Sequence, residues 1–157
     1  MEIVKYLLEH GADNISYALR TASKRGYSEI FNCLLKNGSG YINEALLDAI
    51  INENLELVKY LVEHGADVNA KYDNGSTVLM EASVYGTLEI VKYLVENGAE
   101  NINKALMIVS SKGYLEIVKY LIQNGADVNI EDYQCNTALD FTTNEEIIKI
   151  LKEAGAM

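Results

Sequence analysis

The chain has 157 residues, of which 49% are hydrophobic, and it carries a formal net charge of −10 from 13 basic and 23 acidic residues. This balance argues against binding to nucleic acid or to an anionic membrane, because both need clustered Lys and Arg. No apolar run approaches the roughly 18 residues of a membrane span, and the N-terminus lacks the basic and apolar segments of a signal peptide. The absence of proline and of Gly/Ser-rich stretches predicts one domain over residues 1–157, without a linker.

One short string recurs along the chain and predicts a repeated helix. Copies that read Glu, Ile or Leu, Val, Lys, Tyr, Leu begin at Glu2, Glu56, Glu89 and Glu116, and looser copies begin at Glu29 and Glu146. The apolar residues of each copy share one stripe of an α-helix. Every copy is followed by a glycine, which can adopt the left-handed conformation that ends a helix. These glycines are Gly11, Gly38, Gly65, Gly98, Gly125 and Gly155.

A second kind of helical segment precedes most copies of the string. It is rich in Ala, Ser and Leu and occurs at 18–23, 45–49, 79–83 and 105–106. Small side chains in these segments let neighbouring helices approach closely. Short turns at Gly26-Tyr27, Gly86-Thr87 and Gly113-Tyr114 lead from the first helix into the second. The repeated unit is therefore expected to be an antiparallel helix pair that packs against its neighbours.

The unit at residues 75–100 resembles an ankyrin repeat. Thr77-Val78-Leu79-Met80 stands where that family has Thr-Pro-Leu-His, and the helix string with its final glycine follows. The missing Pro and His concern the bracing of the first helix rather than the fold. The resemblance covers the whole chain and implies an all-α ankyrin-repeat solenoid of stacked antiparallel helix pairs, with about five and a half repeats. The expected repeats are 1–13 (partial), 14–40, 41–67, 68–100, 101–127 and 128–157 (the C-terminal cap).

The lengths of the units predict where hairpin fingers project. The helix-ending glycines are 27, 27, 33, 27 and 30 residues apart. In the 33- and 30-residue units, fourteen positions separate the glycine from the leucine of the next first helix (Leu79 or Leu139), against eight in the 27-residue units. The difference matches the β-hairpin finger of an ankyrin repeat. We therefore expect only two fingers, near residues 67–76 and 127–136, and a shortened inter-helix turn at 142–144 in the last unit.

The N-terminal end allows two interpretations. The chain begins almost directly at a second helix, so that Ile3, Val4, Leu7 and Leu8 would lack a first helix to cover them. One interpretation is that the chain is a piece of a longer array. The other is that this open edge associates with another copy of the chain. We otherwise expect a monomer.

The sequence does not predict catalysis, a metal site or a cofactor. His10 and His64 occupy the same slot of the first and third units, which would place them about 20 Å apart, given roughly 8–10 Å between packed helices. Cys33 takes the place of a packing tyrosine, and Cys135 takes the place of a finger glycine and is expected to be exposed. Neither cysteine has a histidine nearby in sequence or repeat register. We therefore expect a protein that is not an enzyme, with two reduced thiols and a cytoplasmic location.

The resemblance implies that a partner protein binds on the concave side, at the ends of the first helices and at the fingers. Tyrosine and arginine are frequent anchors of such interfaces, and both arginines of the chain lie beside Lys24 in one first helix. The candidate partner-binding residues are Arg20, Lys24, Arg25, Asn52, Lys71, Tyr72, Asp73, Asn74, Val84, Tyr85, Lys112, Glu131, Tyr133 and Gln134. The acidic charge suits a partner with a basic patch.

Two functional hypotheses follow. In the first, the chain is a protein–protein interaction module that presents these residues on a rigid scaffold. In the second, it is a structural spacer or a self-associating segment that uses its open N-terminal edge. The repeats are rich in Ile, Asn, Lys and Tyr and resemble in style the ankyrin proteins of amoeba-infecting giant viruses or of protists. That resemblance would place the partner in the cytoplasm of a host cell.

Overall fold

The computed structural model describes residues 18, 21, 33 and 42–157. The predicted partial repeat 1–13 with its open edge, His10, and the basic cluster Arg20, Lys24 and Arg25 therefore lie outside the described residues. Self-association through that edge stays a prediction. The chain separates into two compact units, residues 1–70 and 71–157, and each is described by itself below.

Seven α-helices account for the regular structure of residues 42–157. The first unit holds α4 (Ile42–Ile51) and α5 (Leu55–Glu63). The second unit holds α6 (Val78–Tyr85), α7 (Leu88–Glu96), α8 (Ile102–Lys112), α9 (Leu115–Gln123) and α10 (Glu145–Glu153). The predicted all-α architecture is confirmed.

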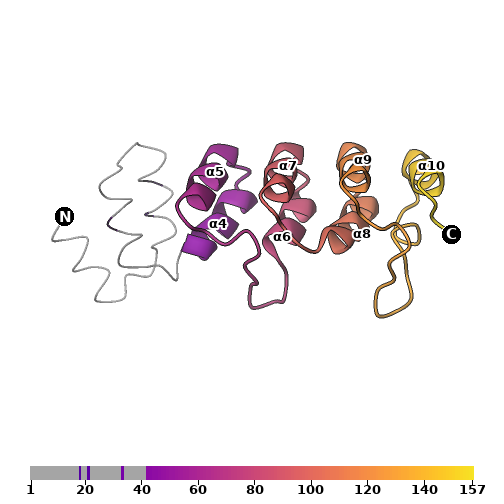
Figure 1. The fold of residues 1–157 in the computed structure, drawn as a ribbon, viewed down its shortest axis with the longest axis horizontal. Coiled ribbons are helices and arrows are strands. Elements are labelled where there is room, and N and C mark those ends of the chain that lie inside the picture. Colours follow the sequence, from indigo (N-terminus) through magenta and orange to yellow (C-terminus); the bar gives the residue numbers. More distant parts are fainter. Residues whose placement is uncertain (1–17, 19–20, 22–32, 34–41) are drawn as a thin grey trace. The chain divides into compact units, whose positions relative to one another are not determined.

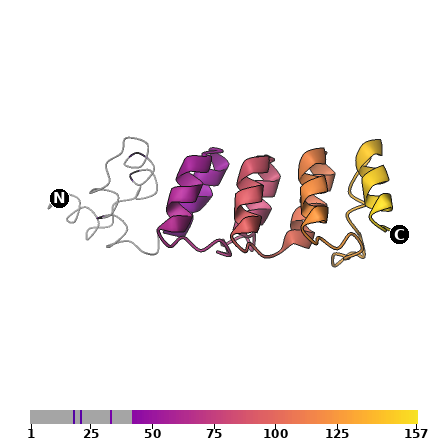
Figure 2. The ribbon, with the colours of Figure 1, turned by 45° about the horizontal axis from the view of Figure 1, so that its top comes forward.

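The helices form packed pairs, as the sequence predicts. In the first unit α4 packs against α5, and in the second unit α6 packs against α7 and α8 against α9. Within the second unit the pairs also stack on each other, because α6 contacts α8, α7 contacts α9, and α9 contacts α10 (Figures 1 and 2). The first helices of these pairs lie on one side of this stack and the second helices on the other (Figure 1).

The recurring leucines and alanines belong to the buried core of each unit. Leu46, Leu79 and Leu106 hold the same place in three first helices, and each is 0% exposed. Alanine follows or precedes them at a helical spacing and is also buried, as in Ala82 and Ala105. Burial of each leucine contributes about 1.5–3 kcal/mol. In the second unit the small residues keep the backbones of α6 and α8 close enough for Leu79 and Leu106 to pack between them.

Every second helix in the described part ends in the same way. After α7, the backbone N–H of Ala99 donates to the carbonyl of Leu94 (3.0 Å) and that of Gly98 donates to Val95 (3.0 Å). This is a Schellman motif, which needs a left-handed residue at its centre, and Gly98 has a φ of +85°. The same pattern of bonds follows α5, α9 and α10. The predicted role of the helix-ending glycines is confirmed at residues 65, 98, 125 and 155.

The last repeat differs from the prediction, because it lacks a first helix. The expected helix around Leu139 is replaced by turns over residues 138–141. The side chain of Asp140 accepts hydrogen bonds from the backbone N–H and the hydroxyl of Thr137 (2.8 and 2.9 Å). Thr142 then accepts from the N–H of Asn144 (3.2 Å), which caps α10. With three residues fewer, the segment has room for one turn before that cap, and a helix would need more.

A hydrogen bond that joins the two ends of a short repeat recurs with a period of 60 residues. In the first unit the side chain of Asn43 accepts from the backbone N–H of Asp67 (2.9 Å). In the second unit Asn103 accepts from Asp127 at the same distance (2.9 Å). Both asparagines lie in the first turn of a helix that begins without a finger, and both aspartates lie just before a longer junction. The recurring structural unit is therefore a fingerless repeat followed by a fingered one.

Gly86 connects α6 to α7 and lies beneath the ring of Tyr114, which belongs to the turn between α8 and α9. A Cβ atom on Gly86 would lie 2.5 Å from that ring, whereas a Cβ on Gly113 would meet nothing within 4 Å. Both glycines have positive φ angles, +75° and +80°. Tyr114 also donates a hydrogen bond from its hydroxyl to the carbonyl of Val84 (3.4 Å). This confirms the structural role that the sequence predicts for this turn.

We expect G86A to destabilise the chain more than G113A. Both variants place a side chain in the left-handed region, at a cost of about 1–2 kcal/mol, but only G86A also displaces Tyr114, for about 1–3 kcal/mol more. Urea denaturation of both variants measures the difference, and the double variant G86A/Y114A should lose part of the excess. Equal midpoints for G86A and G113A would contradict this account.

Candidate functional site

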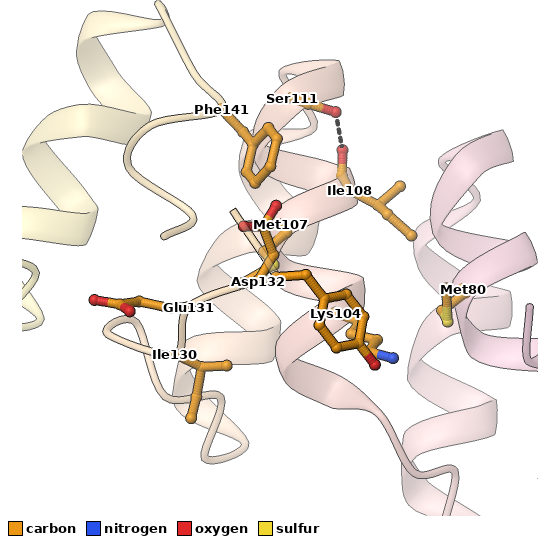
Figure 3. A pocket seen from close by; sticks show the side chains of 10 residues that line it. Met80, Lys104, Met107, Ile108, Ser111, Ile130, Glu131, Asp132 and Phe141 are labelled. Atoms are coloured by element: carbon orange, nitrogen blue, oxygen red, sulfur yellow. Dashed lines mark hydrogen bonds between the residues drawn. The ribbon is translucent and has the colours of Figure 1, made fainter. Parts of the chain in front are cut away.

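A groove of about 480 Å³ lies in the second unit, among α6, α8 and the junction that precedes α10 (Figure 3). Its volume falls within the range of roughly 300–1,000 Å³ that is usual for ligand sites. Met80 contributes from α6. Lys104, Met107, Ile108 and Ser111 contribute from α8, and Ile130, Glu131, Asp132, Tyr133 and Phe141 contribute from the junction.

The groove is lined mainly by apolar side chains that remain accessible. Ile130 and Phe141 are 39% and 38% exposed, and Tyr133 is fully exposed and therefore lies at the rim. Met107 and Ile108 are half-buried on α8. In Figure 3, Ile130 and Phe141 approach from opposite ends, with Met107 between them. Exposed apolar groups from separate segments thus converge on one place, which is a common property of interaction sites.

The groove arises where the repeats depart from their own pattern. Two positions after the buried leucine of the first helix, α4 has Asp48 and α6 has Glu81. The same position holds Ile108 in α8, and the corresponding residue of the last repeat is Phe141. Charged residues at this position are compatible with the fold, so the apolar ones are not needed for packing. Both Ile108 and Phe141 line the groove.

The loop at 131–137 is held by one carboxylate. Asp132 accepts hydrogen bonds from the backbone N–H groups of Gln134 (2.8 Å) and Asn136 (3.0 Å). Its own N–H donates to the carbonyl of Asn136 (2.9 Å), which closes the loop. The hydrogen bond from Asn136 is the main reason that the pKa of Asp132 lies below its usual value. Cys135 in this loop has a φ of +62° and takes the left-handed place that Gly75 occupies in the other loop.

The loop at 71–77 has the same backbone hydrogen bonds but different bracing. The N–H of Tyr72 donates to the carbonyl of Ser76 (3.0 Å), and Lys71 and Thr77 form an isolated antiparallel bridge. Asn74 accepts from the N–H of Ser76 (2.9 Å), and the hydroxyl of Ser76 also contacts Glu81 on α6. Both loops project beyond α6 and α8 (Figure 1). They lie at the predicted finger positions, although the only strand pairing in the described part is the Lys71–Thr77 bridge.

The structure brings only part of the predicted binding set together. Glu131 and Tyr133 line the groove, and Gln134 follows them on the same loop. Val84 and Tyr85 are 37% and 38% exposed at the end of α6. The other predicted residues of the second unit are the exposed Lys71, Asp73, Asn74 and Lys112 and the half-buried Tyr72. Asn52, in the first unit, donates to the carbonyl of Asp48 (2.7 Å).

Sequence reasoning missed most of the groove. The missed residues are Met80, Lys104, Met107, Ile108, Ile130, Asp132 and Phe141. The sequence prediction uses the last turn of each first helix. Met107 and Ile108 lie one turn earlier in α8. A comparison of the residues two positions after each buried leucine would have singled out Ile108 and Phe141.

The described cysteines match their predicted environments, and the described histidine lies near a helix end. The ring of His64 stacks on Tyr60 (4.0 Å between centroids), and its Nδ1 lies 2.7 Å from the carbonyl of Tyr60, near the end of α5. Cys33 is buried and Cys135 is exposed. Within the described residues, no group of three or more His, Cys, Asp or Glu side chains could hold a metal ion. In the same part of the chain, no helix has the length and apolar character to cross a membrane.

Comparison with known proteins assigns the repeats. A family model described as ankyrin repeats (3 copies) matches residues 19–104, and a second, ankyrin repeats (many copies), matches residues 100–141. The chain belongs to the ankyrin repeat family. Ankyrin repeats are generally protein–protein interaction modules and are typically not enzymes.

Two relatives carry similar repeats. The ankyrin chain is 30% identical over 91 residues to human BCL-6 corepressor-like protein 1. This match covers 50% of the chain and 5% of that protein. It is 36% identical over 74 residues to the putative ankyrin repeat protein R579 of Acanthamoeba polyphaga mimivirus. This match covers 44% of the chain and 16% of that protein. The chain therefore spans only a small part of the length of either relative.

We expect Asp132 and Asp140 to make the stability of these ankyrin repeats fall in acid. Hydrogen bonds, from Asn136 and from Thr137 respectively, lower both pKa values in the folded chain below the ordinary 3.8. The unfolded chain then binds more protons as the pH drops below about 4, so the stabilisation present above that pH is lost as the pH falls through the folded pKa values.

Urea denaturation between pH 2.5 and 6 measures the slope of the free energy of unfolding against pH. D132A and D140A should each flatten it. D73A removes an exposed carboxylate that has no hydrogen bond within the described part, and it should leave the slope unchanged. An unaltered slope in both D132A and D140A would rule out this role of the two carboxylates.

Proposed function

We propose that the chain binds a partner protein through the groove, the loops 71–77 and 131–137, and the exposed ends of α6 and α8. The observation that carries this proposal is the pair Ile108 and Phe141. The repeats of α4 and α6 hold a carboxylate at this position, so the fold does not require an apolar side chain there. An accessible apolar surface that the fold does not need is best explained by a partner that covers it.

The lining of the groove supports binding energetically. Removal of apolar surface from water contributes about 25 cal/mol for each Å², and aromatic residues such as Phe141 and the fully exposed Tyr133 are frequent hot spots. The loop that carries Tyr133 is held by the hydrogen bonds of Asp132 before any partner arrives. Little ordering entropy is therefore lost when this surface binds.

The proposal includes the cellular compartment in which the chain meets its partner. The similarity to a mimivirus protein and the style of the repeats support a partner in the cytoplasm of a host cell. Microscopy of the tagged chain in amoebal cells tests this part, and exclusive retention in another compartment would refute it.

The sharpest test uses I108E together with F141S. The first change installs in α8 the kind of residue that α4 and α6 already hold, so folding should be retained, as circular dichroism can confirm. A partner captured with the wild-type chain and then purified should bind the double variant at least about tenfold more weakly, because two apolar contacts are lost.

M157E is the matched control, since Met157 is 95% exposed and does not line the groove. It should bind the partner as the wild-type chain does. Wild-type affinity of the purified partner for I108E/F141S would disprove the assignment of the groove.

A further inference from the structure

The floor of the groove is formed by Met80, Met107 and Ile108. It suits flexible or aromatic apolar side chains of a ligand. The chain has four methionines; Met80 and Met107 line the groove, and the other two are its first and last residues. Methionine is unbranched and polarizable, so it adapts to differently shaped apolar groups. The side chains of Ile108 and Met80 come from adjacent helices, and Figure 3 shows Ile108 pointing toward the helix of Met80. This floor carries no charge.

The rim adds a negative charge that is available to a ligand. Glu131 is exposed, and its carboxylate has no hydrogen bond or ion pair with any residue in the described part of the chain. Asp132 lies next to it and keeps its charge, because its hydrogen bonds lower its pKa. Lys104 is the only cation among the lining residues. It forms no ion pair with another described residue, and in Figure 3 its amine and the Glu131 carboxylate point to opposite sides of the groove.

The surroundings of the groove reinforce this sign. Residues 71–157 contain seven lysines, no arginine and 13 acidic residues, which gives this unit a formal net charge of −6. Such a field attracts cationic segments and repels a second copy of the same acidic chain.

We propose that the groove binds a segment of a partner protein that inserts Leu, Ile, Met or Phe and carries Lys or Arg next to it, with the cation facing Glu131. This inference rests on the proposed function and adds the chemistry of the partner. The apolar side chain supplies the affinity through burial against Met80, Met107 and Phe141. The neighbouring cation selects the segment, because an acidic residue in its place would face two carboxylates.

A display library of random 12-residue peptides tests the proposal directly. The library is selected on the full chain after depletion on the I108E variant, so that only peptides that depend on the groove are retained. Selected sequences should share an apolar residue adjacent to Lys or Arg. Selection on E131K should retain the apolar preference and lose the basic one.

E63K is the control, because it makes the same change of charge at an exposed residue of α5. It should yield the same basic preference as the wild-type chain. A synthetic peptide chosen from the wild-type selection should bind E131K about two- to fivefold more weakly than E63K in fluorescence anisotropy at low salt, which is the range of an exposed ion pair.

The outcomes separate this inference from the proposed function. Selected peptides that are acidic or uncharged beside the apolar residue, or a basic preference that persists on E131K, would overturn the inference while the partner still depends on Ile108 and Phe141. Failure to enrich any peptide that depends on the groove would also overturn it. The proposed function is refuted by a separate result, namely wild-type affinity of the purified partner for I108E/F141S.

Discussion

The second unit depends on the burial of one first helix, α6, against the next one, α8. Leu79 on α6 and Leu106 on α8 are fully buried, and α6 packs directly on α8. Because a single helix pair cannot bury its apolar sides alone, the stability of one repeat is coupled to that of its neighbour. The same contact sets the spacing between α6 and α8 and so brings Met80 and Ile108 close enough to share one groove.

Local elements of this fold can be predicted from the sequence because their causes are local. The second helices, the helix-ending glycines and the loop positions all follow from residues within one repeat. The missing first helix near Leu139 could not be predicted, because it depends on a competition between helix formation and the hydrogen bonds from Thr137 to Asp140. The groove is harder still, since its residues run from Met80 to Phe141 and meet only through tertiary packing.

The two loops show how one backbone pattern serves different surfaces. Both close with an N–H to carbonyl bond across the turn, from Tyr72 to Ser76 and from Asp132 to Asn136. At 71–77 the bracing comes from Asn74 and Ser76, with Glu81 on the adjoining helix. At 131–137 the bracing comes from the carboxylate of Asp132 within the loop itself, and Glu131 and Tyr133 are exposed beside it. The surface chemistry of each loop therefore follows from which residue braces it.

The bonds from Asp67 to Asn43 and from Asp127 to Asn103 bear on how such a chain grows. Each bond joins the first helix of a short repeat to the last residue of that same repeat, at the point where the longer repeat begins. A duplicated cassette of two repeats carries both members with it. Gene-level expansion that proceeds sixty residues at a time would preserve every junction. Each added cassette built like residues 41–100 would bring two more first helices and one more loop on which a new specificity could evolve.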